Sequence, residues 1–559
     1  MSPQPQRRRH LARGLLQPGL ACAGPAALGL LLVACGEATP PSAISPGGAD
    51  VPKESARLTA APAAPSAAPE RPKVSVSLLY TSDEHGWLLA HPDKDGTLRG
   101  GAAELLGQLR AREGHGPSSP PVTGAEGPAT LLLSGGDNYT GPAISSYFDG
   151  EPMAEALARM GYAASAFGNH EFDFGRPRFI QNRARAGLVY LAANVHAEDP
   201  ALKPEMDLPA FQVFERRGAR IGVVGLATET TLTTAMASRF AGVAIEAEEP
   251  ALDRAVKAAW ESGPDALVLI AHECPDRLEP MLARHPEWRL TFAFGGHCHK
   301  IVKIDAAGGT PLYSPGWRLE SYLRVRLTID PSRPLRERVV GVDPELVEVT
   351  QREGSTVPVD AELARSIAQW KVKLDVELGE PIGYAATGFD KDSKEIARWI
   401  TEAWRRELKT DVAIVNTGGI RQSLPKGTIT KATLWSVLPF DNKLVICELL
   451  GRDLVADLAL EEAAYSGIVK VGESYRLSDG KPLDMNRRYR VATVDFLYAG
   501  GANFTFQKQD PKPKETSLDW RTPIINWMKA QKTSERAPLE RFVAAGDSVV
   551  VGASATKHH

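Results

Sequence analysis

Short apolar runs alternate with polar loops and amphipathic stretches along the chain from Val74 onwards. The apolar runs are a few residues long and rich in aliphatic and β-branched side chains, which is typical of buried strands. Between them, AAELLGQLRARE and PMAEALARM carry apolar residues at helical spacing. Strands that alternate with helices predict a layered α/β domain. The runs are VSVSLLYT, ATLLLSGG, YAASAF, LVYLAAN, RIGVVGLA, ALVLIA and LTFAFGG.

Polar side chains gather directly after five of these apolar runs. Each cluster alone is a weak signal, since a surface turn that caps a helix also favours Asn, Asp and Gly. Five clusters in order are more specific, because open α/β sheets place their sites at the carboxyl ends of the strands. The clusters are Asp83-Glu84-His85, Gly136-Asp137-Asn138, Gly168-Asn169-His170-Glu171, Ala271-His272-Glu273 and Gly296-His297-Cys298-His299.

The residue types in these clusters predict a hydrolase with two divalent cations. Imidazoles with a few carboxylates favour Zn, Mn, Fe or Co over Mg or Ca. Two cations about 3.5–4 Å apart can hold a hydroxide between them and grip both ends of an in-line displacement. Asp83, Asp137 and a bridging hydroxide would remove three of the four positive charges. The site would stay positive, as an incoming phosphate requires, which accounts for the neutral Asn169.

The order of these motifs resembles the metallophosphoesterase (calcineurin-like) superfamily. The octet GNHEFDFG, together with VNTGGIR and LPF further along the chain, resembles the 5′-nucleotidase family more narrowly. The resemblance covers about residues 74–551. It implies an α/β fold with an N-terminal four-layer α/β/β/α metallophosphoesterase domain and a C-terminal α+β 5′-nucleotidase substrate-recognition domain.

The resemblance also implies roles for the clustered residues, position by position. Asp137 would be shared between two metal sites. His170 would be the catalytic histidine that stabilises or protonates phosphoryl oxygens, and Asp173 would orient it. Glu171 is interpreted as structural, and the alternative for His272 is a strand-end histidine bonded to backbone. One metal would be held by Asp83, His85, Asp137 and His299, and the other by Asp137, Asn169, His272 and His297.

In the second domain, the resemblance implies a pocket for a nucleotide. Asn416 and Arg421 in NTGGIR match residues near the phosphate and sugar, and a guanidinium suits phosphate because it bonds two oxygens at once. Phe440 and Phe496 match two rings that sandwich the base. The alternative is that both phenylalanines belong to the core and that Arg421 forms a surface ion pair.

The sequence departs from the family pattern around the sugar. The motif GGDG reads here GGAN, so Ala502 stands where an Asp would bond the ribose hydroxyls, with Asn503 as a possible substitute. The stretch KDSKEIARWITEAW lacks the usual Arg and Gly-Asn pair in register, which leaves Lys391 or Arg398 as candidates. Hydrolysis of a phosphate ester is therefore better supported than nucleotide specificity.

The N-terminus has the features of a bacterial export signal. Arginines precede the short apolar run AALGLLLVA, which ends at Cys35 in a pattern that resembles a lipobox. Cys35 would then carry the lipid, with an ordinary secretory signal as the alternative. The domains we expect are a lipoprotein signal peptide at 1–35, an Ala/Pro/Ser-rich disordered tether at 36–72, the metallophosphoesterase domain at 73–350, a linker helix at 351–380 and the C-terminal domain at 381–553.

Composition and cysteine usage add two limits. A net charge of −3 over 559 residues points to neither nucleic acid nor a charged membrane surface as a partner. Beyond the leader only Cys274, Cys298 and Cys447 remain, so one disulfide is possible, but the sequence does not choose the pair. Cys298 lies between two predicted ligands and is interpreted as a packing residue, with redox sensitivity as the alternative.

These observations together predict an exported two-metal phosphohydrolase in the periplasm or at the cell surface. Its substrate would be a small phosphate ester, a nucleotide in the first instance, attacked by the hydroxide between the metals. The chain offers no sign of a protein partner. Two alternatives stay open, namely a phosphoesterase for a non-nucleotide substrate and a surface lipoprotein that binds without turnover.

Overall fold

The computed structural model describes residues 72–93, 95–116, 129–206, 208–351 and 357–544. The expected signal peptide and lipid anchor, and all but the last residue of the expected tether, lie outside these residues. None of the described helices is long and apolar enough to cross a membrane.

A six-stranded sheet carries the first three polar clusters. Four of its strands run parallel in the order β1-β4-β5-β6, and β15 and β16 extend it antiparallel beyond β1. The antiparallel edge was not predicted from the sequence. The bounds are β1 Val74–Thr81, β4 Thr130–Ser134, β5 Ala164–Ala166, β6 Val189–Leu191, β15 Ser321–Ile329 and β16 Val339–Glu348.

A second six-stranded sheet carries the other two clusters. Strands β9, β11, β12 and β14 run parallel, and β8 and β13 pair antiparallel at the two edges. The bounds are β8 Phe211–Arg216, β9 Ala219–Ala227, β11 Ala266–His272, β12 Phe292–Phe294, β13 Ile301–Ala307 and β14 Thr310–Pro315.

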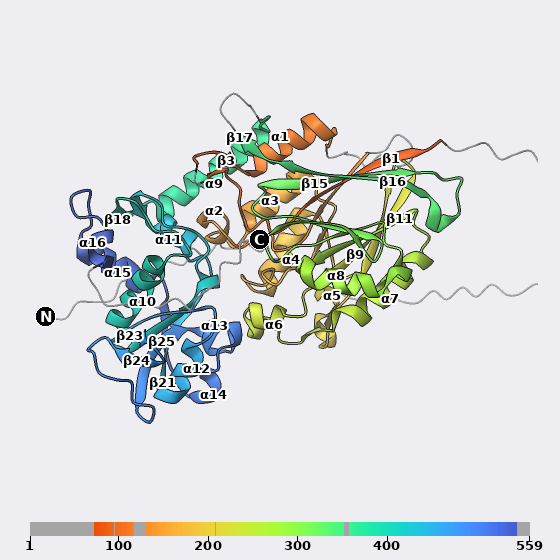
Figure 1. The fold of residues 1–559 in the computed structure, drawn as a ribbon. Coiled ribbons are helices and arrows are strands. Elements are labelled where there is room, and N and C mark those ends of the chain that lie inside the picture. Colours follow the sequence, from red (N-terminus) through yellow and green to blue (C-terminus); the bar gives the residue numbers. More distant parts are fainter. Residues whose placement is uncertain (1–71, 94, 117–128, 207, 352–356, 545–559) are drawn as a thin grey trace, which may run out of the picture. The chain divides into compact units, whose positions relative to one another are not determined.

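The two sheets face each other and helices cover their outer faces (Figure 1). Leu78 and Tyr80 of β1 pack with Val223 of β9 in the core between the sheets, because alternate side chains of a strand point to opposite faces. Leu79 points the other way and packs with helices α1, α3 and α4. The predicted four-layer α/β/β/α fold is therefore confirmed. The helices are α1 Ala102–Glu113, α3 Glu151–Met160, α4 Arg176–Ala186, α7 Glu248–Glu261 and α8 Pro275–Arg284.

Helix α9 (Ala361–Leu378) lies within the range expected for a linker helix. Its side chains Leu363, Ile367 and Leu374 belong to the same core cluster as α1 and α3. Glu155 of α3 accepts hydrogen bonds from Ser366 Oγ at 2.6 Å and Trp370 Nε1 at 3.0 Å. Helix α9 is therefore packed against the first layer of helices rather than free between domains.

The remaining chain forms a mixed five-stranded sheet with helices, coloured blue-green to blue in Figure 1. Only β19 and β25 pair in parallel, and the other neighbours are antiparallel. One large core unites these strands with the helices. The elements are α10 Lys394–Leu408, β19 Val412–Asn416, α11 Lys431–Val437, β21 Lys443–Leu450, α12 Gly451–Leu458, β22 Ala463–Ser466, β25 Arg488–Val494, α13 Asp495–Tyr498, β26 Lys514–Asp519 and α15 Thr522–Gln531.

Smaller elements complete the described chain. They are β2 His91–Pro92, β3 Leu98–Arg99, α2 Ala143–Ser146, β7 Val195–Ala197, α5 Lys203–Met206, α6 Thr231–Thr234, β10 Val243–Ile245, β17 Thr350–Gln351, β18 Pro381–Ala385, β20 Gly427–Thr430, β23 Ile468–Val471, β24 Ser474–Leu477, α14 Phe506–Gln509 and α16 Glu540–Ala544, with short 3₁₀ turns between them.

Candidate metal centre and substrate pocket

All seven predicted metal ligands lie at the carboxyl ends of neighbouring strands. Those that follow β1, β4 and β5 come from one sheet, and those at the ends of β11 and β12 come from the other. Six of them form two groups whose ligand atoms lie within 4.8 Å of one another. The groups are Asp83, His85 and His299, and Asp137, His272 and His297.

Five of the predicted ligands have a left-handed backbone conformation, with positive φ, which residues other than glycine rarely adopt. Their φ angles lie between 44° and 65°. Each such residue costs on the order of 1–3 kcal/mol, and such strain concentrates at functional sites. The loops are therefore held in an unfavourable conformation that aims their side chains at a common point. The five are Asp83, His85, Asp137, His297 and His299.

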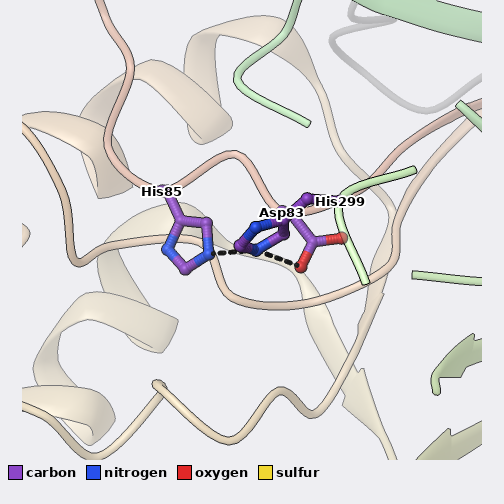
Figure 2. A group of neighbouring side chains, drawn as sticks. All are labelled: Asp83, His85 and His299. Carbon is purple, nitrogen blue, oxygen red and sulfur yellow. Dashed lines mark hydrogen bonds and ion pairs between the residues drawn. The ribbon is translucent and has the colours of Figure 1, made fainter. Parts of the chain in front are cut away.

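The three side chains of the first group lie next to one another, with His299 between His85 and Asp83 (Figure 2). His85 Nε2 lies 3.1 Å from His299 Nε2, and His299 Nε2 lies 3.5 Å from Asp83 Oδ1. Asp83 Oδ1 is buried and has no hydrogen-bond partner. His85 Nδ1 lies 2.9 Å from the carbonyl oxygen of Thr140, which assigns the ring proton to Nδ1 and leaves the Nε2 lone pair facing His299.

The second group repeats this arrangement around His272. Its Nδ1 lies 2.8 Å from the carbonyl oxygen of Gly135, so the proton belongs there and Nε2 again presents a lone pair. Nε2 lies 3.0 Å from Asn169 Oδ1 and 3.2 Å from His297 Nδ1. His272 is therefore bonded to the backbone through Nδ1, as the alternative interpretation expected. Its Nε2, however, faces the predicted ligands Asn169 and His297.

Asp137 lies between the two groups. Its Oδ2 is 3.2 Å from His272 Nε2 and 3.6 Å from His85 Nε2, while Oδ1 accepts a hydrogen bond from the backbone N–H of His170 at 2.8 Å. Burial alone would raise the pKa of Asp137, but the neighbouring His272 and His170 hold it well below its usual value when their rings are protonated. The side chain is therefore an ionised carboxylate within reach of both groups.

The donor set fits a pair of divalent cations. A carboxylate oxygen of Asp83 without a hydrogen-bond partner, the amide oxygen of Asn169 and the Nε2 lone pairs of His85 and His272 gather at one place, where, among the described residues, only Arg421 contributes a donor, to His85. Such a buried arrangement is unfavourable unless cations lie among the acceptors. Mixed imidazole and carboxylate donors suit Zn, Mn, Fe or Co.

The GNHE loop approaches Asp137 so closely that its first residue has no room for a side chain. A Cβ on Gly168 would lie 2.1 Å from Asp137 Oδ1. Glycine therefore allows the loop to place Asn169 and His170 beside the carboxylate. Glu171 points away from this centre and accepts hydrogen bonds from Asn138 and Tyr190, in keeping with a structural role.

His170 and Asp173 form a pair beside the two groups. His170 Nδ1 lies 2.8 Å from Asp173 Oδ2, and both side chains are mostly buried. Burial alone would lower the pKa of His170, but the carboxylates of Asp173 and Asp137 raise it above its usual value. The imidazole is therefore oriented by Asp173 and biased toward its protonated form, with Nε2 free of that bond.

A cavity of about 260 Å³ opens over this centre. Its wall contains ten of the predicted site residues, whereas Asp83, His85 and His272 lie beneath the wall, in contact with residues that line it. The ten are Asp137, Asn169, His170, Asp173, His297, His299, Asn416, Arg421, Phe440 and Phe496. The structure thus brings together the seven predicted metal ligands, the pair His170 and Asp173, and the four residues that match the family's nucleotide pocket.

Residues of the second domain contact the predicted metal ligand His85 and the predicted catalytic residue His170. Arg421 Nη2 lies 3.0 Å from His85 Nε2, and the Phe440 ring stacks on His170 with centroids 5.3 Å apart and planes at 24°. Phe440 and Phe496 are half-buried at the edge of the C-terminal core. Their rings therefore pack against the core and also line the cavity. Arg421 contacts His85 instead of forming the ion pair at the surface that was the alternative.

The sequence missed several residues of the cavity wall. Thr233, Met236 and Arg239 come from the segment after β9. This segment has no cluster of typical metal ligands, so no pattern in the sequence singled it out. Asp441 also lines the cavity and could have been found from the sequence, because it directly follows the LPF motif. Glu462 lies near no motif that would have indicated it. The proposed substitutes Lys391, Arg398 and Asn503 do not belong to the wall formed by the described residues, whereas Ala502 does.

The interpretation of Cys298 as a packing residue is wrong. Cys274 and Cys298 form a disulfide with Cα atoms 5.2 Å apart, and Cys447 is buried as a free thiol. The ends of the neighbouring strands β11 and β12 bring the first two cysteines together, a contact that spacing along the chain does not reveal. The bond joins the loop of His272 to the loop of His297 and His299.

Comparisons with known proteins identify relatives along most of the chain. The family model for the 5′-nucleotidase C-terminal domain matches residues 381–467 and 456–509. Protein UshA of Yersinia enterocolitica is 26% identical over 501 residues, which cover 77% of this chain and 86% of that protein. The 5′-nucleotidase of Vibrio cholerae is 24% identical over 535 residues, or 85% and 93% of the two chains. The 5′-nucleotidase precursor of Thermus thermophilus shares the fold, with a TM-score of 0.70, 21% identity and coverage of 82% and 97%.

Proposed function

We propose that this chain, which belongs to the 5′-nucleotidase family, hydrolyses phosphate esters of nucleotides with the aid of two divalent cations. The family supports a metal-dependent phosphoesterase. The number of cations and the roles of individual residues are inferred from the site.

The position of Asp137 between two groups of inward-facing acceptors carries the proposal. Asp83, His85 and His299 would hold one cation, Asn169, His272 and His297 the other, and Asp137 both. Cations bound there would act as Lewis acids toward phosphoryl oxygens and supply a hydroxide nucleophile at neutral pH.

The chain's own side chains would bind and orient the phosphoryl group. Arg421 extends its guanidinium to the ligand His85, where its planar fork can bond two phosphoryl oxygens. His170 lines the same cavity and can hold a proton at Nε2 for the developing charge or the leaving oxygen, because Asp173 occupies Nδ1.

The base of a nucleotide would lie against the aromatic part of the wall. Phe440 and Phe496 offer flat apolar surfaces to which any base can stack. Asn416 lines the cavity near Arg421 and can hydrogen-bond the sugar or the phosphate. This arrangement favours a nucleotide over a simple aryl phosphate.

Export and lipid attachment belong to the same proposal. They rest on the arginine-rich start, the apolar run at 26–34 and Cys35 in the sequence. A lipid at Cys35 and the Pro- and Ala-rich segment after it would keep the enzyme at a membrane surface outside the cytoplasm.

A second candidate is a phosphoesterase for a substrate without ribose hydroxyls. The observation in its favour is Ala502, which lines the cavity with a methyl group and offers no hydrogen bond. In this case the metal centre would act unchanged on a different ester.

Hydrolysis of AMP, UDP-glucose, a cyclic nucleotide and p-nitrophenyl phosphate, each followed by its own products, separates the two candidates. The purified protein would be assayed with Mn, Zn or Co and with a chelator. We expect metal-dependent release with AMP well ahead of the aryl ester. Equal rates on AMP and the aryl ester would favour the second candidate, and no release with any metal would contradict both.

A further inference from the structure

Three N–H groups converge on one backbone carbonyl beside the cavity. The carbonyl oxygen of Phe440 accepts hydrogen bonds from Arg521 Nη1 at 3.0 Å, from Arg521 Nη2 at 2.9 Å and from Trp520 Nε1 at 3.0 Å. A carbonyl oxygen has two lone pairs, so three donors saturate it. The donors come from the junction between β26 and α15, far along the chain from Phe440.

Arg521 is an unusual residue at such a junction. It is 3% exposed, and its guanidinium lies 4.1 Å from the centre of the Trp435 ring. Its nearest carboxylate, Asp519, is 3.5 Å away, and its Nε has no hydrogen-bond partner. Removing a guanidinium from water is costly even beside one carboxylate, and here two of its nitrogens donate to a neutral carbonyl.

The held carbonyl belongs to the short loop that presents Phe440 to the cavity. Pro439 fixes the backbone just before Phe440, and the backbone N–H of Trp520 donates to the carbonyl of Asn442 at 3.3 Å just after it. The loop is therefore held on both sides. The ring itself stacks on His170 at 5.3 Å and lies 5.7 Å from the Arg421 guanidinium.

We propose that Arg521 is a positioning residue for the substrate, which fixes the backbone of Phe440 so that its ring presents one face to the base of a nucleotide. The inference rests on the proposed function and deepens it. A ring that is already fixed loses less conformational entropy when a base stacks on it, so the fixed carbonyl favours binding. Arg521 itself does not touch the reacting atoms.

The substitution Arg521→Met tests this role because it keeps an apolar stem over Trp435 and removes both donors. We expect the KM for AMP to rise about tenfold, since charge-assisted hydrogen bonds hold the ring in place. The KM and kcat for p-nitrophenyl phosphate and the metal content should stay as in the wild type. Arg452→Met is the matched control, because Arg452 is 60% exposed and outside the cavity wall.

The substitution Arg521→Lys tests whether a positive charge is enough to hold the Phe440 carbonyl, or whether two parallel donors are needed. A single ammonium cannot supply two parallel donors, so this variant should also raise the KM for AMP, by about fivefold or more, with the charge kept. The lysine variant decides the question if the methionine variant does not fold. A wild-type KM for AMP in a folded variant, or an equal rise in KM for the aryl phosphate, would overturn the proposal.

A double-mutant cycle with Phe440→Ala separates positioning from general stability. In the Phe440→Ala background the ring is gone, so Arg521→Met should change the KM for AMP by less than about twofold. If the rise in KM for AMP in the double variant equals the product of the rises in the two single variants, the proposal is overturned. The failure of the proposed function would look different, because the wild-type protein would then show no preference for AMP over the aryl phosphate.

Discussion

Asp137 is the residue on which both groups of predicted ligands depend. One of its oxygens faces His272 and His85, and the other accepts the backbone N–H of His170. Its environment keeps the carboxylate ionised at neutral pH. At the residue scale, we therefore propose that Asp137 retains the cations and that His170 transfers a proton.

Replacing Asp137 tests the shared role. Asp137→Ala should lose both cations and lower kcat by at least about a thousandfold, because the Lewis acid contribution of the cations is worth several kcal/mol. Metal analysis after gel filtration measures the loss. Asp149→Ala, at a carboxylate that is 48% exposed, serves as the control and should keep both cations. Retention of two tightly bound cations by Asp137→Ala would contradict the shared position.

His170→Ala should have a different signature. The variant should bind cations as the wild type does, because His170 donates nothing but a backbone N–H to the ligand Asp137. Its kcat should fall about 100- to 10,000-fold, the usual contribution of a general acid or base. Steady-state kinetics with metal analysis of the same sample tests both expectations. Full activity of this variant would show that His170 has no catalytic role.

At the scale of elements, the sequence predicted the strands and helices that pass through the core. The runs VSVSLLYT and AAELLGQLRARE match β1 and α1 residue for residue, and α9 lies within the range 351–380 expected for the linker helix. Their periodicity is strong because one face, or both, is buried. Strand β13, at a sheet edge, has mostly exposed or half-exposed side chains and no apolar run, so its sequence IVKIDAA gave no comparable signal.

The candidate site could be predicted from the sequence, whereas the disulfide could not. The ligands follow strong apolar strands and have the residue types that metals require, so their order alone suggested the site. Three cysteines allow three pairings, and only the neighbouring ends of β11 and β12 select Cys274 with Cys298. Wall residues such as Thr233 and Glu462 have side chains that are common on any surface, so no pattern distinguished them.

The disulfide should stabilise the metal centre, because it joins two ligand loops. The double substitution Cys274→Ser and Cys298→Ser should weaken cation binding about tenfold, as the loss of supporting contacts around ligands usually does. It should also lower the free energy of unfolding by about 3 kcal/mol, from a bond that spans 24 residues. Competition with a chelator measures the first effect, with Cys447→Ala as the control. Unchanged cation affinity would show that the loops hold their geometry without the bond.

At the scale of the whole molecule, the cavity draws on segments that lie far apart in the sequence. Arg421 contacts a ligand 336 residues earlier, and Phe440 stacks on the histidine of the GNHE motif. A nucleotide would therefore meet metal ligands from the first domain and aromatic rings from the second. The leader and the tether would place this enzyme outside the cytoplasm.

Lipid attachment has a direct test in cells of a bacterium that processes lipoproteins. The wild-type chain should incorporate labelled palmitate and remain with membranes. Cys35→Ser should lose the label, because the thiol that accepts the lipid is gone. Cys22→Ser, also in the leader, is the control and should stay labelled. A wild-type chain without label would favour an ordinary secretory signal.

We propose that hydrolysis of a nucleotide depends on two cations, bound by the two groups around Asp137. The most direct test is to strip the purified protein with a chelator and titrate Mn or Zn back while phosphate release from AMP is followed. We expect no activity without metal and full activity only after two equivalents have bound. Full activity with one equivalent, or no release with any metal, would contradict the proposal.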